Sequence, residues 1–336
     1  MKHIRTLVLI LFACFASVAW GQQPAGKCIN SWAQFHRYNM QRYNPCEKVL
    51  TVNNVGSLGV LWSYPVPGGM YSSPAVSNGV VYFGSWDSPE VYALKASTGA
   101  KLWSYTVGGS IYSSPAVANG MVYVGSWDNN VYAVNARTGT KLWSYSTGAS
   151  VWSSPAVANG VVYVGSDDWS VYALNASTGA LLWTYTTGNG VRSSPAVANG
   201  VVYVASDQLY ALSASTGALL WTYPAGGLTS SPAVANGVIY VGSLDHNVYA
   251  LNASTGAKLW SYTTFNQVYS SPAVANGVVY VGSEFPDGNV NALNASTGAL
   301  LWSYYTADYA GSSPAVANGV VYVGSDYGDV YAFGLK

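Results

Sequence analysis

Short apolar segments with alternating polar positions recur along the chain, separated by turns that contain glycine. In one unit, "SSPAVA" leads through Asn159-Gly160 into "VVYVGS", "VYALNA" follows, and "STG" leads into "ALLWTY". The pair Asn-Gly favours a two-residue hairpin turn, because both of its residues tolerate the positive φ angles that this turn needs. Each unit therefore predicts four short antiparallel strands.

This unit recurs seven times, at intervals of 37 to 42 residues. Its prolines are Pro74, Pro115, Pro155, Pro195, Pro232, Pro272 and Pro314. Four strands repeated at about 40 residues are typical of a β-propeller blade. Proline cannot donate a hydrogen bond to a ladder, so we expect it inside the first strand of each blade, at the inner edge of the sheet.

The two ends of the repeat region complement each other. The segment "LGVLWSY" at residues 58–64 predicts a fourth strand without its first three, and residues 312–333 predict three strands without a fourth. Pairing them would leave no open sheet edge. We therefore predict an all-β fold over residues 58–336, a seven-bladed β-propeller of four-stranded antiparallel blades whose last blade is closed by an N-terminal strand.

The N-terminus has the pattern of an export signal. Lys2 and Arg5 precede an apolar run, and Ala19 and Gly21 supply the small residues of a cleavage site. Residues 1–21 thus predict a signal peptide rather than a transmembrane segment, and the protein is expected to be periplasmic or secreted. The alternative is a lipoprotein signal with Cys14 acylated, which would make the protein an outer-membrane lipoprotein.

Residues 22–57 form a lead-in segment that does not belong to the repeats. It contains the two cysteines that remain after cleavage, Cys28 and Cys46. In an oxidising compartment an even number of cysteines favours pairing, so we predict a disulfide between them.

The stretch "ALNASTGALLW", residues 173–183, resembles the A-x-D-x-x-T-G-x-x-x-W pattern of pyrroloquinoline-quinone-type (PQQ-like) repeats, with Asn in place of the usual Asp. The resemblance covers residues 58–336. It implies that one Trp in each unit docks a blade on its neighbour: Trp62, Trp103, Trp143, Trp183, Trp221, Trp260 and Trp302. Quinoprotein dehydrogenases share this repeat with non-catalytic relatives, among them the propeller lipoprotein of the outer-membrane β-barrel assembly machinery, so it implies a fold rather than a reaction.

Composition narrows the function further. Only 8% of the residues are charged and the formal net charge is zero, so the basic surface that nucleic acids require is missing. The quinoprotein alcohol dehydrogenases that share the repeat carry adjacent cysteines and a calcium site, whereas this chain has no adjacent cysteines. We therefore expect no enzymatic activity, no PQQ and no other cofactor, and a quinone-dependent dehydrogenase is the less favoured alternative. The repeated Ser-Ser pairs have no base beside them, so we expect their hydroxyls to bind backbone groups near the channel.

Differences between blades indicate where a site could lie. The turns between first and second strands and between third and fourth strands hardly vary from blade to blade. The second-to-third loops and the connections between blades do vary, and strand alternation places them together on the other face of the ring, which we call the variable face. Most acidic residues lie on this variable face. The candidate ligand-binding residues there are Tyr71, Trp86, Asp87, Tyr112, Trp127, Asp128, Trp152, Asp167, Asp168, Trp169, Arg192, Asp245, Tyr269 and Tyr327.

Three hypotheses follow for this variable face. Trp and Tyr are enriched at binding hot spots, so we predict a monomeric, non-catalytic module that binds a protein or peptide. The alternative is a carbohydrate or small-ligand module, with aromatic rings stacked on sugars and Ca²⁺ as an additional ligand of the carboxylates. A third interpretation assigns no ligand at all: the acidic loops keep the protein soluble and the aromatic residues cap the blades.

Overall fold

The computed structural model describes residues 61–67, 69–228, 230–284, 288–306, 312–317, 320–324 and 330–334. The predicted signal peptide, the lead-in segment, the Cys28–Cys46 disulfide and Tyr327 lie outside these residues. Within them the chain forms 27 β-strands in seven antiparallel sheets, which confirms the predicted all-β, seven-bladed propeller. The described residues contain no helix of the length and apolarity needed to cross a membrane.

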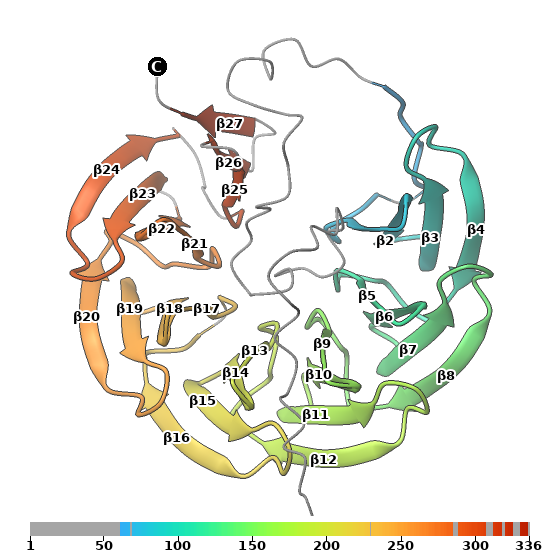
Figure 1. The fold of residues 1–336 in the computed structure, drawn as a ribbon, viewed down its shortest axis with the longest axis horizontal. Helices are drawn as coiled ribbons and strands as arrows, with labels where there is room; N and C mark the ends of the chain where they lie inside the picture. The colour runs from blue at the N-terminus through green and yellow to red at the C-terminus, as the bar shows by residue number, and fades with distance from the viewer. Residues whose placement is uncertain are drawn as a thin grey trace, which may run out of the picture.

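The sheets follow one another around a ring (Figure 1). The first three blades are β1 (Ala75–Ser77), β2 (Val80–Gly84), β3 (Glu90–Lys95) and β4 (Lys101–Thr106); β5 (Ala116–Ala118), β6 (Met121–Gly125), β7 (Asn130–Asn135) and β8 (Lys141–Ser146); and β9 (Ala156–Ala158), β10 (Val161–Gly165), β11 (Ser170–Asn175) and β12 (Leu181–Thr186).

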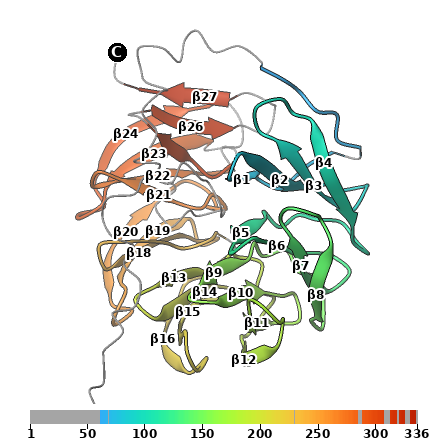
Figure 2. The same ribbon diagram turned by 45° about the vertical axis from the view of Figure 1, so that its right-hand side comes forward.

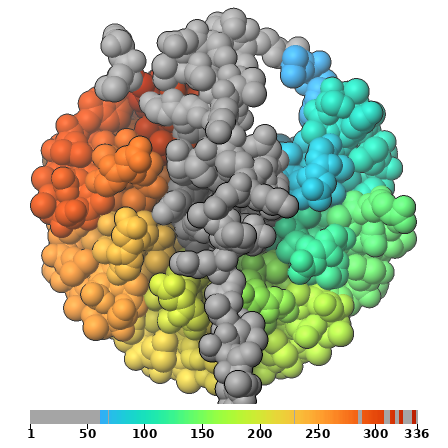
Figure 3. All heavy atoms as spheres, in the orientation of Figure 1, coloured from blue at the N-terminus to red at the C-terminus, as the bar shows by residue number. Residues whose placement is uncertain are grey.

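The next three blades are β13 (Ala196–Ala198), β14 (Val201–Ala205), β15 (Gln208–Ser213) and β16 (Leu219–Pro224); β17 (Ala233–Ala235), β18 (Val238–Gly242), β19 (Asn247–Asn252) and β20 (Lys258–Thr263); and β21 (Ala273–Ala275), β22 (Val278–Gly282), β23 (Asn289–Asn294) and β24 (Leu300–Tyr305). The seventh has three strands, β25 (Ala315–Ala317), β26 (Val320–Gly324) and β27 (Val330–Phe333). Figure 2 shows the blades as separate twisted sheets, and in Figure 3 they pack side by side around the disc.

Each blade runs from the centre of the ring outward, with its first strand innermost, as predicted (Figure 1). The prediction that proline lies inside this strand is wrong. The inner strand begins at the residue after the proline and pairs through only three residues, as in Ala156 with Tyr163. Proline has no N–H to donate, so the ladder begins one residue beyond it.

Closure of the seventh blade also differs from the prediction. Leu61–Tyr64 form no strand, and residues 58–60 lie outside the described part, so the sheet of β25, β26 and β27 has no fourth strand among the described residues. Trp62 nevertheless makes the contact expected of a fourth-strand Trp. Its Nε1 donates to the Ala96 carbonyl of the first blade at 2.8 Å.

The same docking contact links the other blades. Trp143 Nε1 donates to the Ala176 carbonyl of the next blade at 2.9 Å, and the Tyr123 hydroxyl donates to the same carbonyl at 3.1 Å. The apolar core lies between neighbouring blades, where Tyr123 and Val131 pack with Val162. Trp302 differs: it is 37% exposed and contacts Phe333 edge-on at 4.8 Å.

Serine hydroxyls hold the inner strands together, as the sequence predicted. The first Ser of a pair binds backbone within its blade, as when Ser113 Oγ accepts from Gly125 N at 2.7 Å. The second Ser accepts from the backbone N–H of the preceding blade, as when Ser154 Oγ accepts from Ser114 N at 2.9 Å. The acceptors of this ring are Ser114, Ser154, Ser194, Ser231, Ser271 and Ser313.

Candidate functional site

Five of the predicted residues form one aromatic cluster on the variable face: Tyr71, Trp86, Tyr112, Trp127 and Trp152. Trp86 and Trp127 come from second-to-third loops, and the other three directly precede the Ser-Ser pairs. Tyr112 lies at the centre, with ring centroids 4.8 Å from Tyr71, 5.0 Å from Trp127 and 4.6 Å from Trp152. Trp86 contacts Trp127 edge-on at 4.4 Å. Loops of neighbouring blades thus place side chains that are far apart in sequence in one continuous group.

A charged pair ends the cluster at the third and fourth blades. Arg192 Nε donates to Asp167 Oδ1 at 2.9 Å and Arg192 Nη2 donates to Asp167 Oδ2 at 3.2 Å. Trp152 Nε1 donates to the same Oδ2 at 2.9 Å, and the Arg192 guanidinium carbon lies 5.0 Å from the centroid of the Trp152 ring. The hydrogen bond to Asp167 raises the pKa of Arg192 above its ordinary value. Asp167 therefore orients both the indole and the guanidinium.

One polar atom inside the cluster lacks a partner. Trp127 Nε1 is buried and has no hydrogen-bond acceptor within the described part of the chain. An unsatisfied buried donor costs about 1–3 kcal/mol, and such groups are concentrated at functional sites. Among the described residues Trp127 Nε1 therefore keeps one hydrogen bond to donate.

Asp128, Asp168 and Asp245 are also on the variable face, but their carboxylates are engaged in scaffold contacts. Asp168 Oδ2 accepts from Tyr172 Oη at 2.7 Å and from Gly148 N at 2.5 Å, while Oδ1 accepts from Ser170 N at 3.0 Å. The same three kinds of bond surround Asp128 and Asp245. Each aspartate ties its own loop to the preceding inter-blade connection, and we call this arrangement the aspartate clamp.

The aspartate clamp shifts the pKa values of its tyrosines and of Asp245. Burial, together with the hydrogen bond to its aspartate, raises the pKa of Tyr172 and of Tyr249 well above the ordinary value. Burial opposes ionisation of Asp245, but hydrogen bonds from Tyr249 and Asn247 outweigh it and lower the pKa of this carboxyl. The sequence predicted these aspartates as ligand-binding residues. A Tyr four residues after each of them is the signal in the sequence that indicates a repeated Asp–Tyr hydrogen bond instead.

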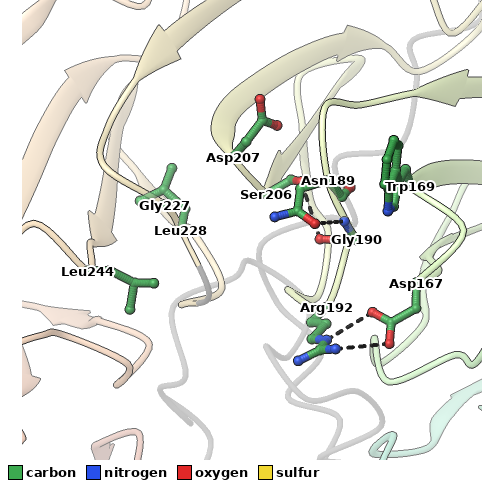
Figure 4. A pocket seen from close by; sticks show the side chains of 10 residues that line it. All are labelled: Asp167, Trp169, Asn189, Gly190, Arg192, Ser206, Asp207, Gly227, Leu228 and Leu244. Carbon is green, nitrogen blue, oxygen red and sulfur yellow. Dashed lines mark hydrogen bonds and ion pairs between the residues drawn. The ribbon is translucent and has the colours of Figure 1, made fainter.

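The remaining candidates lie apart from the aromatic cluster. Tyr269 is 40% exposed, donates to Gln267 Oε1 at 3.0 Å and has no ring contact with the cluster within the described residues. Asp87 is exposed and makes no hydrogen bond in the described part of the chain. Trp169 is 53% exposed and faces a pocket of about 370 Å³ that also borders Asp167 and Arg192 (Figure 4).

Metal-ligating side chains do not gather in groups among the described residues. These residues contain no group of three or more His, Cys, Asp or Glu side chains placed to hold a metal ion. The inner strands instead carry serines whose hydroxyls are bound to backbone.

Fold and site together define a PQQ-like β-propeller with an aromatic cluster on one face. A family model described as outer membrane protein assembly factor BamB matches residues 49–153, 146–227 and 205–336, and the chain therefore belongs to this PQQ-like repeat family. No curated protein matches the sequence.

Solved structures show the same fold. BamB from Moraxella catarrhalis is 24% identical, with a TM-score of 0.72 and coverage of 82% of this chain and 86% of that one. Quinohemoprotein alcohol dehydrogenase from Comamonas testosteroni is 15% identical, with a TM-score of 0.80 and coverage of 90% and 71%. The related enzyme ADHIIG from Pseudomonas putida HK5 is 18% identical, with a TM-score of 0.76 and coverage of 90% and 70%. At these identities the likeness concerns the fold alone.

Proposed function

We propose that this protein is an exported, non-catalytic propeller that binds a protein or peptide partner through the aromatic cluster. The observation that carries the proposal is the continuity of this cluster across the first three blades, ending at the oriented Asp167–Arg192 pair. Aromatic residues and Arg dominate binding hot spots because they bury a large area with little loss of rotamer freedom. The family description supports a partner that takes part in outer-membrane protein assembly.

The cluster combines a rigid centre with accessible edges. Tyr71 is 66% exposed, whereas Trp86, Tyr112, Trp127 and Trp152 are half-buried against one another. Half-buried rings are already ordered, so a partner covers their edges at little entropic cost. Arg192 adds a directional group, since its side chain is 58% exposed although its guanidinium is fixed by Asp167.

Affinity capture from the native cell envelope, followed by titration with the purified partner, tests the proposal. Hot-spot truncation costs about 2 kcal/mol or more, so Trp152→Ala is expected to weaken the partner about 30-fold. Leu142→Ala is the matched control, because Leu142 is 47% exposed at the start of β8, beside the opposite face. Equal partner affinity of wild type and Trp152→Ala, with both folded by their melting curves, would refute the proposal.

The non-catalytic part of the proposal is tested separately. Purified protein mixed with PQQ and Ca²⁺ is expected to leave the absorption spectrum of the quinone unchanged and to oxidise no alcohol. A saturable spectral change with alcohol-dependent dye reduction would show that the protein is an enzyme.

A further inference from the structure

The second-to-third loop of the fourth blade is two residues shorter than those of the neighbouring blades. Ser206 and Asp207 join β14 to β15, whereas residues 166–169 join β10 to β11. The shortened loop keeps two of the three bonds of the aspartate clamp, because Asp207 Oδ1 accepts from Tyr210 Oη at 2.9 Å and from Gly188 N at 3.2 Å. It therefore lacks the loop positions that Asp167 and Trp169 occupy in the third blade, which leaves a gap between the loops of the variable face.

The pocket lies at this gap (Figure 4). Trp169 borders it from the third blade and Leu244 from the fifth, while Leu228, only 3% exposed, is buried at its lining. Its volume of about 370 Å³ is at the lower end of the range of small-molecule sites, about 300–1,000 Å³. The pocket thus coincides with the shortest of the described second-to-third loops.

Trp169 adopts a backbone conformation that is unfavourable for its residue type. Its φ is +70°, the left-handed region that bulky side chains rarely occupy. The equivalent loop positions of the neighbouring blades hold Asn129 at +70° and His246 at +71°, residue types that tolerate this region better. A strained Trp that is 53% exposed at a pocket indicates that the indole serves a ligand rather than the fold.

The pocket also presents polar atoms. Arg192 uses Nε and Nη2 for Asp167, so its Nη1 has no acceptor among the described residues. Asn189 Oδ1 accepts from Gly190 N at 2.8 Å, and within the described chain its Nδ2 donates to no group. Asp207 Oδ2 receives only Gln208 Nε2, at 3.5 Å. Two donors and one acceptor are therefore available among the residues that line the pocket.

We propose that this pocket binds a pyranose ring of a carbohydrate, at a site that adjoins the aromatic cluster and shares Asp167 and Arg192 with it. The apolar face of a sugar ring stacks on an exposed indole, and each sugar hydroxyl both donates and accepts, which suits Arg192, Asn189 and Asp207 together. An aromatic side chain of a peptide would use Trp169 and Leu244 but would leave these three polar groups without partners. The polar lining therefore favours a sugar.

The test uses ¹⁵N-labelled protein and the indole N–H signal of Trp169, assigned by its loss in Trp169→Asn. Methyl glucoside, galactoside and mannoside in both anomers, and N-acetylglucosamine, are titrated, with N-acetylphenylalanine amide as the peptide-like competitor. At least one sugar is expected to shift this signal saturably. No shift with any sugar, or a shift with N-acetylphenylalanine amide alone, would overturn the proposal.

Two variants separate the contribution of the Trp169 indole to sugar binding from the effect of relieving the strained backbone. Trp169→Asn and His246→Asn both place Asn in the left-handed region, so both are expected to raise the melting temperature. Only Trp169→Asn is expected to lose sugar affinity, by at least tenfold, as measured by calorimetry; unchanged affinity in Trp169→Asn would contradict the proposal. Grafting residues 127–130 between Ser206 and Leu209 fills the gap and is expected to abolish binding, and retained binding in this folded variant would contradict it as well.

Discussion

Asp167 and Asp168 are adjacent in sequence, but their contacts predict opposite consequences for the same substitution. Asp168→Asn disturbs an aspartate clamp that ties the loop of the third blade to Gly148 and Tyr172. Asp167→Asn disturbs only the side-chain contacts to Arg192 and Trp152. The first substitution is expected to lower stability and leave partner binding intact, and the second to do the reverse.

The magnitude follows from the three hydrogen bonds of the clamp. If the amide introduced by Asp168→Asn keeps its oxygen toward Tyr172 and Gly148, its NH₂ group faces the Ser170 N–H, and one donor loses its acceptor. An unsatisfied donor costs about 1–3 kcal/mol, and the two remaining bonds lose the strengthening effect of the charge. We expect Asp168→Asn to lower the free energy of unfolding by about 2 kcal/mol. Asp167→Asn removes an exposed ion pair, which is worth about 0–1 kcal/mol.

Urea unfolding followed by circular dichroism measures both losses. The slope against urea is expected to stay unchanged, so that the midpoint reports stability alone. Partner affinity is then titrated for the same two variants, each serving as the control for the other. A stability loss for Asp168→Asn no larger than that for Asp167→Asn would refute the assignment of Asp168 to the scaffold.

Two further predictions concern packing and pH. Gly139→Ala is expected to destabilise the protein by more than Gly120→Ala in thermal melts. Both glycines have positive φ (+72° and +76°), which costs Ala about 1–2 kcal/mol at either position. A Cβ at Gly139 would in addition lie 2.7 Å from the Trp103 ring, whereas a Cβ at Gly120 would meet nothing within 4 Å. Burial raises the pKa of Tyr123 and of Tyr163 from 10.0 to about 12, so their stabilising contribution is complete below pH 10 and is lost as the pH rises toward 12. Tyr123→Phe should reduce this alkaline loss in urea titrations at pH 9 and 11, and an unchanged pH dependence would contradict the linkage.

The repeat made the architecture predictable. Because each turn and each docking Trp occurs in every unit, the sequence specified the strands, the Trp143 contact with the next blade and the two faces of the ring. The inner strands were predicted too long, since Pro155 does not reveal where pairing begins. The fourth strand of the last blade was a prediction from symmetry, whereas Trp62 docks without strand pairing over residues 61–64.

The site was only partly predictable, because its contacts join loops of different blades. The residue types of the aromatic cluster were recognised, but the contacts between Trp152, Asp167 and Arg192 depend on which loops the ring brings together. Asp168 was predicted to be a ligand-binding residue because of its charge and its place on the variable face, whereas its carboxylate accepts a hydrogen bond from Tyr172. The pocket arises from a two-residue deletion at Asp207, which is visible in sequence, whereas its volume depends on the packing of neighbouring loops.

Site-specific photo-crosslinking in intact cells tests the central claim most directly. A photoreactive amino acid is placed at position 71, on the exposed edge of the aromatic cluster, or at position 142, beside the opposite face. The account predicts one defined partner adduct at position 71, none at position 142, and loss of the adduct when Trp152→Ala is present in the same chain. Adducts of equal yield at both positions, or at position 142 alone, would contradict it.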